Sequence, residues 1–257
     1  KTWTAGLLSA MREAGPEGGD VHIVSSNRHS IVNCLSPFIR RHWAGLGMSG
    51  PADYAGAREA LADPGTAAAR LLEDEACGIR SVPVAPDMPF CQLVDLGRLD
   101  YSAVDGRLAG AGRGRGFLVN VDYAFGEEGF FLFNEMLEML GRSVRGVYVM
   151  GKAGTLAGGR GDIMLPSYFV KQGSGDVYDL DNRLVPDDFE GTGGLRVHTG
   201  GPMLTVSGTF LQNEGVLTYF RDNWKALGVE MEGIPYARAI RHAILRERVD
   251  PGIKVGV

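Results

Sequence analysis

The sequence predicts an α/β fold in which a β-sheet lies between layers of helices. Short runs of β-type residues alternate along the chain with segments of helical periodicity, an order typical of this class. Several runs are apolar at successive positions, as in strands that are buried on both faces. The 257 residues, 44% of them apolar, can supply one large core, so we predict a single α/β domain over residues 1–257.

The expected elements follow from apolar patterning and from glycines that cluster where the apolar runs end. The runs expected to be strands span residues 21–24, 91–96, 117–124, 146–151, 162–170, 195–200, 203–208 and 253–257. The segments expected to be helices span residues 30–43, 54–63, 66–76, 127–141 and 233–248. Thr66 is a candidate N-cap residue because it follows an Asp-Pro-Gly break.

Two segments depart from this alternation. Residues 40–85 are richer in Ala, Asp, Glu and Pro, and we interpret them as a candidate insertion or lid. Residues 172–194 are rich in Gly and Asp and are expected to form a surface excursion without regular structure.

Composition limits the classes of partner and site. The net charge of −5 gives no attraction to a nucleic-acid backbone, and no apolar run reaches the length of a membrane span. Cys34, Cys77 and Cys91 are scattered without metal-ligand spacing, which predicts reduced thiols in a cytoplasmic protein and no metal site. The chain begins at Lys1 and ends inside an apolar run at Val257, so further residues are expected beyond both ends.

Two loops that follow apolar runs could bind an anion. The loop "GKAGTLAGGRGDIMLP" (151–166) offers Lys152 and Thr155, and its glycines would let a ligand approach the backbone. The loop "SSNRHS" (25–30) joins a strand to a helix, where backbone N–H groups favour anions, and it adds Arg28 and His29. Structural interpretations stay open, because the first loop is also typical of a turn between strands and the second of a helix cap.

Two later segments could bind a nucleoside-like molecule. "VSGTFLQNEG" (206–215) contains an aromatic residue among small polar neighbours, which could form a wall for a flat ring. "VEMEG" contains two glutamates, and a carboxylate can accept hydrogen bonds from both hydroxyls of a ribose. The alternatives are a core aromatic residue and an acid that favours the dipole at a helix start.

Together and in this order, these segments resemble the nucleoside phosphorylase and nucleosidase superfamily, which cleaves N-glycosidic bonds of nucleosides. "GKAGTLAGGRGDIMLP" is similar to the glycine-rich turn and GD-[VI]-[VI] strand of that family. "LTVSGTFLQNEG" and "ALGVEMEG" are similar to the stretch that ends in VEME in the methylthioadenosine/adenosylhomocysteine nucleosidases. The similarity covers residues 117–246 well and 21–36 loosely. It implies a three-layer sandwich with a central mixed β-sheet flanked by helices.

The resemblance also implies roles for individual residues. Glu232 would bind the ribose hydroxyls, Met231 would line the sugar and Glu230 would lie beside them. Phe210 would stack on the base, with Leu211 next to it.

Three departures from the family pattern shape the predicted reaction. Arg28 and His29 stand in the loop where nucleosidases carry a water-positioning acid, and Val149 and Lys152 stand where phosphorylases carry Arg and Ser. The catalytic Asp of the family is expected beyond Val257. The basic loops predict phosphate binding by a set of four residues: Arg28, His29, Lys152 and Thr155.

The sequence therefore predicts N-glycosidic cleavage of a purine-type nucleoside by phosphorolysis, with inorganic phosphate as co-substrate and no cofactor. One alternative is hydrolysis of a nucleoside or nucleoside 5′-monophosphate, as in AMP nucleosidase. Another is a non-catalytic nucleoside-binding protein of the same fold. The expected partners are a small-molecule nucleoside or nucleotide and further copies of the chain in a homo-oligomer, with neither nucleic acid nor membrane.

Overall fold

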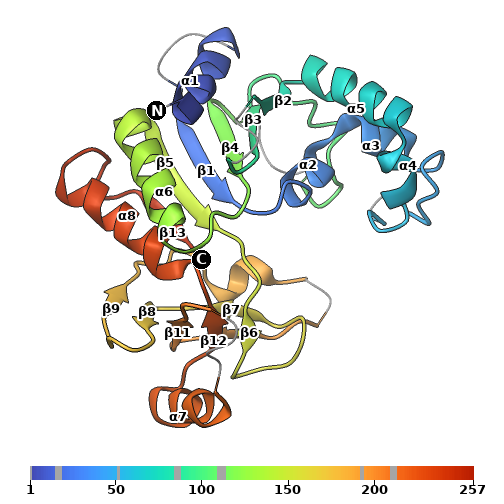
Figure 1. Cartoon of the computed structure of the whole chain (residues 1–257). Coiled ribbons are helices and arrows are strands. Elements are labelled where there is room, and N and C mark those ends of the chain that lie inside the picture. Colours follow the sequence, from blue (N-terminus) through green and yellow to red (C-terminus); the bar gives the residue numbers. More distant parts are fainter. Residues whose placement is uncertain are drawn as a thin grey trace. The chain divides into compact units, whose positions relative to one another are not determined.

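The computed structural model describes residues 2–14, 19–50, 53–83, 88–108, 114–191, 194–208 and 213–257. The chain divides into two compact units, Lys1–Asp122 (unit 1) and Tyr123–Val257 (unit 2). Each unit combines strands with helices that pack on them (Figure 1). The predicted class, α/β with mixed sheets flanked by helices, is confirmed. A single domain over residues 1–257 with a lid stays a prediction.

Unit 1 is built on four neighbouring strands in the order β1-β4-β3-β2. Its elements are α1 (Thr2–Ala14), β1 (Val21–Ser25), α2 (Ser30–Leu35), α3 (Pro37–His42), α4 (Arg58–Ala62), α5 (Pro64–Ala76), β2 (Ile79–Val82), β3 (Cys91–Asp95) and β4 (Phe117–Val121). β1 runs parallel to β4, whereas the β4–β3 and β3–β2 pairs are antiparallel. α1 packs on β2 and β3, α5 packs on β2, and α3 and α4 pack on α5. Residues 40–85 thus supply α4, α5 and β2, together with the end of α3.

Two details of unit 1 correct the sequence prediction. The helix expected over 30–43 is interrupted at Ser36, whose backbone is extended at ψ 115, because a residue before proline disfavours the helical region. The N-cap residue of α5 is Asp63 and not Thr66, since the Asp63 carboxylate accepts the backbone N–H of Thr66 at 2.9 Å. Thr66 supplies the donor of the cap, so the prediction located the break correctly but chose the wrong residue.

Unit 2 contains several short strands and three longer helices. Its elements are α6 (Gly126–Leu140), a 3-10 turn (Gly141–Ser143), β5 (Val144–Val149), β6 (Gly154–Thr155), β7 (Ile163–Leu165), β8 (Tyr168–Lys171), β9 (Val177–Asp179), a second 3-10 turn (Pro186–Phe189), β10 (Val197–Thr199), β11 (Pro202–Thr205), α7 (Glu214–Trp224), β12 (Gly228–Glu230), α8 (Gly233–Leu245) and β13 (Lys254–Gly256). One sheet has the order β6-β12-β11-β8-β9, with parallel pairs at its centre and antiparallel pairs at its edges. β13 pairs with β5, and β10 with β7, both in parallel.

Two expectations for unit 2 were wrong. The single strand expected over 162–170 is two strands, β7 and β8, because Pro166 between them has no N–H to donate to a sheet. The excursion expected over 172–194 contains β9, which pairs with β8, and a 3-10 turn.

The first turn of α8 is held in place by close packing on α6. Tyr236 is 2% exposed, and its hydroxyl lies 3.1 Å from both the backbone N–H and the carbonyl oxygen of Ala124. A Cβ added at Gly129 would lie 2.7 Å from the Tyr236 ring, so only glycine allows this approach. α8 also packs against β8, β9 and β11, which fixes the position of its N-terminus in unit 2.

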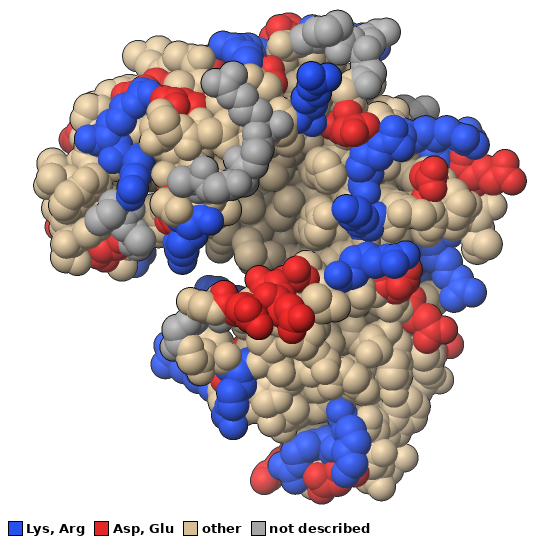
Figure 2. All heavy atoms as spheres, turned by 180° about the vertical axis from the view of Figure 1, so that it is seen from behind, with Lys and Arg blue, Asp and Glu red and all other residues tan. Residues whose placement is uncertain are grey.

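On the face drawn in Figure 2, Lys and Arg side chains lie interspersed with Asp and Glu. Within the ranges that the structure describes, no helix is long and apolar enough to cross a membrane.

Candidate functional site

The junction between β12 and α8 holds the residues of the "VEMEG" motif, which we call the carboxylate site (Glu230, Met231 and Glu232). Glu230 ends β12, opposite Thr205 of β11. Its carboxylate accepts the Thr205 hydroxyl and two backbone N–H groups, from Glu232 at 2.6 Å and from Gly233. The first N–H groups of a helix have no acceptor within the helix and carry partial positive charge. Glu230 therefore accepts the free N–H groups at the start of α8 and stabilises that end of the helix.

Glu232 has a different environment from Glu230. It is the N-cap residue of α8, yet its side chain makes no hydrogen bond to the helix. It is half-buried, and this burial raises the pKa of its carboxyl group, while a backbone N–H of Met231 acts in the opposite direction. Of the two carboxylates, Glu232 is thus the better placed to accept hydrogen bonds from a ligand.

We expect Glu230 to make stability depend on pH. Burial raises the pKa of Glu230 to about 6, from an ordinary value of 4.5, against the opposing effect of its hydrogen bonds. The stabilising contribution of the protonated form is present below pH 4.5 and is lost as the pH rises through 6. Glu230→Gln does not titrate, so between pH 4.5 and 7 the stability of the variant relative to wild type should rise by about 2 kcal/mol.

Urea unfolding of both proteins at several pH values measures this difference. Glu214→Gln, at an exposed position on α7, is a matched control and should show no such pH dependence. A wild type that gains stability relative to Glu230→Gln as the pH rises would contradict the raised pKa.

Met231 faces the core of unit 2. It is half-buried and packs against a cluster of buried residues from β8, β12, β11 and the position just after β11: Val170, Val229, Leu204 and Val206. This packing gives Met231 a structural role in unit 2. Its predicted contact with a sugar stays a prediction.

The glycine-rich loop forms the edge of the same sheet. β6 pairs antiparallel with β12, with Thr155 opposite Gly228 and Gly154 opposite Val229. A Cβ at Gly154 would lie 2.9 Å from the Val229 side chain, and one at Gly228 would lie 2.6 Å from the Gly154 carbonyl oxygen. These glycines therefore allow two strands to approach closely. Strand packing alone accounts for their presence, without a ligand.

The two predicted phosphate-binding side chains of this loop differ in environment. The Thr155 hydroxyl accepts the backbone N–H of Gly158 at 2.9 Å and so closes a turn. The Lys152 side chain is exposed. Their binding of phosphate stays a prediction, and so does the base-binding role of Phe210 and Leu211, which lie outside the residues that the structure describes.

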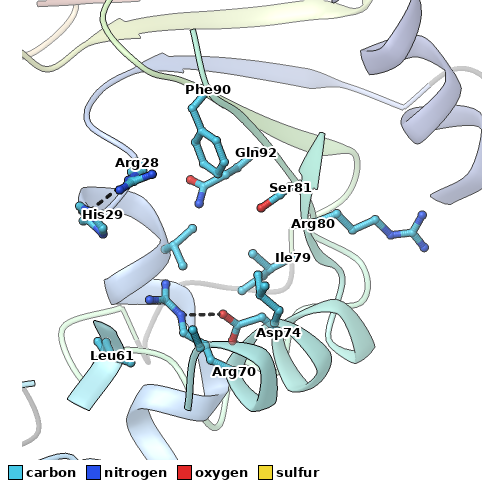
Figure 3. Close-up of a pocket in the computed structure, with 13 residues that line it drawn as sticks. Arg28, His29, Leu61, Arg70, Asp74, Ile79, Arg80, Ser81, Phe90 and Gln92 are labelled. Atoms are coloured by element: carbon cyan, nitrogen blue, oxygen red, sulfur yellow. Dashed lines mark hydrogen bonds and ion pairs between the residues drawn. The ribbon is translucent and has the colours of Figure 1, made fainter. Parts of the chain in front are cut away.

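In unit 1, the predicted residues Arg28 and His29 line a pocket of about 170 Å³. We call it the arginine–glutamine pocket. Its lining comes from the loop after β1 and from α2, α4, α5, β2 and β3 (Figure 3), and includes Arg28, His29, Val32, Leu61, Ala67, Arg70, Leu71, Asp74, Ile79, Arg80, Ser81, Phe90 and Gln92. The Arg28 guanidinium lies 5.9 Å from the centre of the Phe90 ring. A cation and an aromatic ring thus flank one side of the pocket.

Arg70 is held at the base of this pocket by an ion pair with the buried Asp74. Its Nε lies 3.1 Å from Asp74, whose other carboxylate oxygen accepts the Ser36 hydroxyl at 2.6 Å. In Figure 3 the terminal nitrogens of Arg70 lie on the pocket side of this ion pair, whereas the Arg80 guanidinium points away from the pocket. Arg70 thus has N–H groups available to a ligand.

Gln92 is oriented by a chain of buried polar side chains. The Ser26 hydroxyl donates to Asn120 Oδ1 at 2.7 Å, and Asn120 Nδ2 donates to Gln92 Oε1 at 2.9 Å. Because the Gln92 oxygen is used as an acceptor, its amide N–H groups remain as donors, and the side chain points into the pocket in Figure 3. The pocket therefore contains a fixed neutral donor between its arginines.

His29 lies beside Arg28 in the lining of this pocket. Its Nε2 lies 3.3 Å from Arg28 Nε, which makes the imidazole nitrogen the acceptor. Burial lowers the pKa of His29, and the charges of Arg28, Arg70 and Arg58 lower it further, while Asp122 acts against them. The largest cause of the lowered pKa is therefore burial, and the charges of the three arginines add to it.

Sequence reasoning missed Arg70, Phe90 and Gln92 as lining residues. Two signals could have found Gln92 and Arg70: Gln92 is the lone polar residue at the start of an apolar strand, and Arg70 precedes Asp74 by the four residues of a helical ion pair. In the described ranges, no three of the His, Cys, Asp and Glu side chains lie close enough together to hold a metal ion.

Comparison with solved structures defines the class of fold. Native futalosine hydrolase of Helicobacter pylori has a TM-score of 0.52 at 10% identity, over 90% of this chain and 84% of that chain. A 5′-methylthioadenosine/S-adenosylhomocysteine nucleosidase of Colwellia psychrerythraea, in complex with adenine, has a TM-score of 0.50 at 16% identity, over 91% and 80% of the two chains. Both belong to the nucleoside phosphorylase and nucleosidase superfamily, so the predicted resemblance is confirmed at the level of the fold.

The family follows from the sequence match. Residues 1–47 and 53–256 match the model of a family of unknown function (DUF6909), and the chain belongs to that family. No curated protein matches this chain.

Proposed function

We propose that this chain cleaves the N-glycosidic bond of a purine nucleoside by hydrolysis. The observation that carries the proposal is the division of roles in the carboxylate site, where Glu230 is engaged by the start of α8 and Glu232 is available to a ligand. The fold supports it, since structures that share it include a hydrolase and nucleosidases. One of these structures holds adenine, which favours a purine base.

The chemistry of the bond explains why a carboxylate is useful here. Cleavage of a ribosyl C–N bond builds positive charge on the sugar and negative charge on the leaving base. A carboxylate that accepts the ribose hydroxyls orients the sugar and stabilises this positive charge, and its effect grows toward the transition state. Glu232 takes this role in the proposal, and Met231 offers an apolar surface to the sugar.

Phosphorolysis is the second candidate, and one observation favours it. The loop after β1 carries Arg28 and His29, and its six residues "SSNRHS" contain no acid to position a water molecule. In that reaction inorganic phosphate would replace water as the nucleophile. Homo-oligomer assembly and a cytoplasmic location stay predictions for either reaction.

A panel of substrates tests the proposal. Adenosine, inosine, 5′-methylthioadenosine and AMP are each incubated with the protein, with and without inorganic phosphate, and the released base and sugar product are measured. We expect release of a purine base without phosphate and with free ribose or its derivative as the second product. Release that needs phosphate and yields a sugar 1-phosphate would establish phosphorolysis instead. Tight binding without release of base would indicate a nucleoside-binding protein.

A further inference from the structure

The arginine–glutamine pocket of unit 1 has the composition of a binding site for an organic anion. Its volume of about 170 Å³ is below the range of about 300–1,000 Å³ that is usual for pockets that enclose a drug-sized ligand. It therefore suits a single charged group with a small apolar body. We propose that the pocket binds a small molecule with a carboxylate or phosphate head and a flat apolar body.

The polar part of the lining is rich in donors. Arg28 and Arg70 present guanidinium N–H groups, and the hydrogen-bond chain from Ser26 through Asn120 leaves Gln92 with only N–H groups to offer. Oxygen atoms of a carboxylate or phosphate accept hydrogen bonds and match such a set, and guanidinium groups bind them with two parallel bonds.

The charges in and around the pocket favour an anion even when the carboxylates beside the arginines are counted. Asp74 offsets the charge of Arg70, and the Arg80 guanidinium points away from the pocket. Arg28 adds a positive charge at the rim, and its closest contacts in the described ranges are to an imidazole and an aromatic ring. Arg28, Arg70 and Arg58 each add to the lowering of the His29 pKa that burial causes, whereas Asp122 opposes it.

The apolar part of the lining distinguishes this pocket from a site for inorganic phosphate. Val32 and Ile79 are buried at 3% and 5% exposure and belong to one core cluster, so they form a fixed floor. Phe90 forms a wall beside them (Figure 3). A free phosphate ion would gain nothing from these side chains, whereas a ring attached to the anion would bury apolar surface on them.

Four probes separate the head from the body in calorimetric titrations. Phenyl phosphate and benzoate carry both parts, inorganic phosphate carries only a head, and phenol carries only a body. We expect phenyl phosphate and benzoate to bind, inorganic phosphate to bind at least about tenfold more weakly, and phenol not to bind. Bound anion should also raise the pKa of the His29 imidazole in NMR titrations, because an anion favours the imidazolium.

A pair of arginine variants locates the site. Arg28→Gln should weaken binding of phenyl phosphate about tenfold, since it removes a charged donor from an exposed side chain. Arg98→Gln is the matched control, because Arg98 is an exposed residue of unit 1 that does not line the pocket, and it should change the affinity less than about twofold.

Equal effects of Arg28→Gln and Arg98→Gln, or equal affinities for phenyl phosphate and inorganic phosphate, would overturn the proposal. So would an unchanged His29 pKa at saturation with phenyl phosphate. These titrations measure binding and not base release, so their outcome does not depend on whether the chain cleaves nucleosides.

Discussion

Glu232→Gln should lower the turnover of base release about 10- to 100-fold, which is the range expected when a hydrogen bond to a charged group is lost. The amide keeps the size of the side chain but removes the negative charge that would stabilise a cationic ribose. We expect the loss mainly in kcat and not in KM, because the contact with the hydroxyls strengthens toward the transition state. Steady-state kinetics on the best nucleoside of the panel measure this.

The fold of this variant should be intact, because the Glu232 side chain makes no hydrogen bond to α8. Its melting temperature should therefore match that of wild type. Glu214→Gln, at the exposed start of α7, is the control for the loss of a carboxylate and should keep full turnover. Unchanged turnover in Glu232→Gln would remove this residue from the site.

Gly233→Ala should destabilise unit 2 by about 1–3 kcal/mol or more, the cost of overpacking a core. A Cβ at this position would lie 2.2 Å from Cε1 and 2.5 Å from Cδ1 of the Phe169 ring. Phe169 is 1% exposed and is packed in a core cluster, so the ring has no room to withdraw. Thermal or urea unfolding measures the loss.

Gly151→Ala is the matched control for this substitution. Its Cβ would meet no heavy atom of the described residues within 4 Å, and its backbone does not need a positive φ. It should change the stability by less than about 0.5 kcal/mol. Equal stabilities of the two variants would show that Phe169 and α8 can separate at little cost, and the start of α8 would then not be a rigid platform.

Long periodic segments could be predicted from the sequence, whereas the shortest strands could not. The apolar stripe of residues 127–141 became α6, with Phe133, Leu137 and Leu140 buried. β6 has two residues and β12 has three, too few to show alternation or an apolar run. Their pairing depends on glycines that fit against a neighbouring strand, which is a property of the folded chain.

The candidate sites show the same limit. The sequence identified Glu230 and Glu232 as a pair but could not separate their roles, because the hydroxyl that engages Glu230 comes from Thr205, 25 residues earlier. In unit 1 it identified Arg28 and His29, but Arg70 and Gln92 reach the same pocket from α5 and β3. Such convergence depends on strand and helix packing that no local pattern encodes.

The hydrogen-bond chain from Ser26 to Gln92 has a direction, and that direction determines which ligands the pocket of unit 1 can prefer. Each amide in the chain could rotate by half a turn with little change in shape, and the observed arrangement is the one in which the Ser26 hydroxyl donates to the Asn120 oxygen and leaves the Asn120 N–H groups to donate to Gln92. Loss of that hydroxyl would remove the donor that favours this arrangement, and inversion of both amides would then turn the oxygen of Gln92 toward the ligand. A single substitution two strands away could thus change a pocket for anions into one that tolerates cations. The ligand preference of the pocket could evolve in this way without a change in any residue that contacts the ligand.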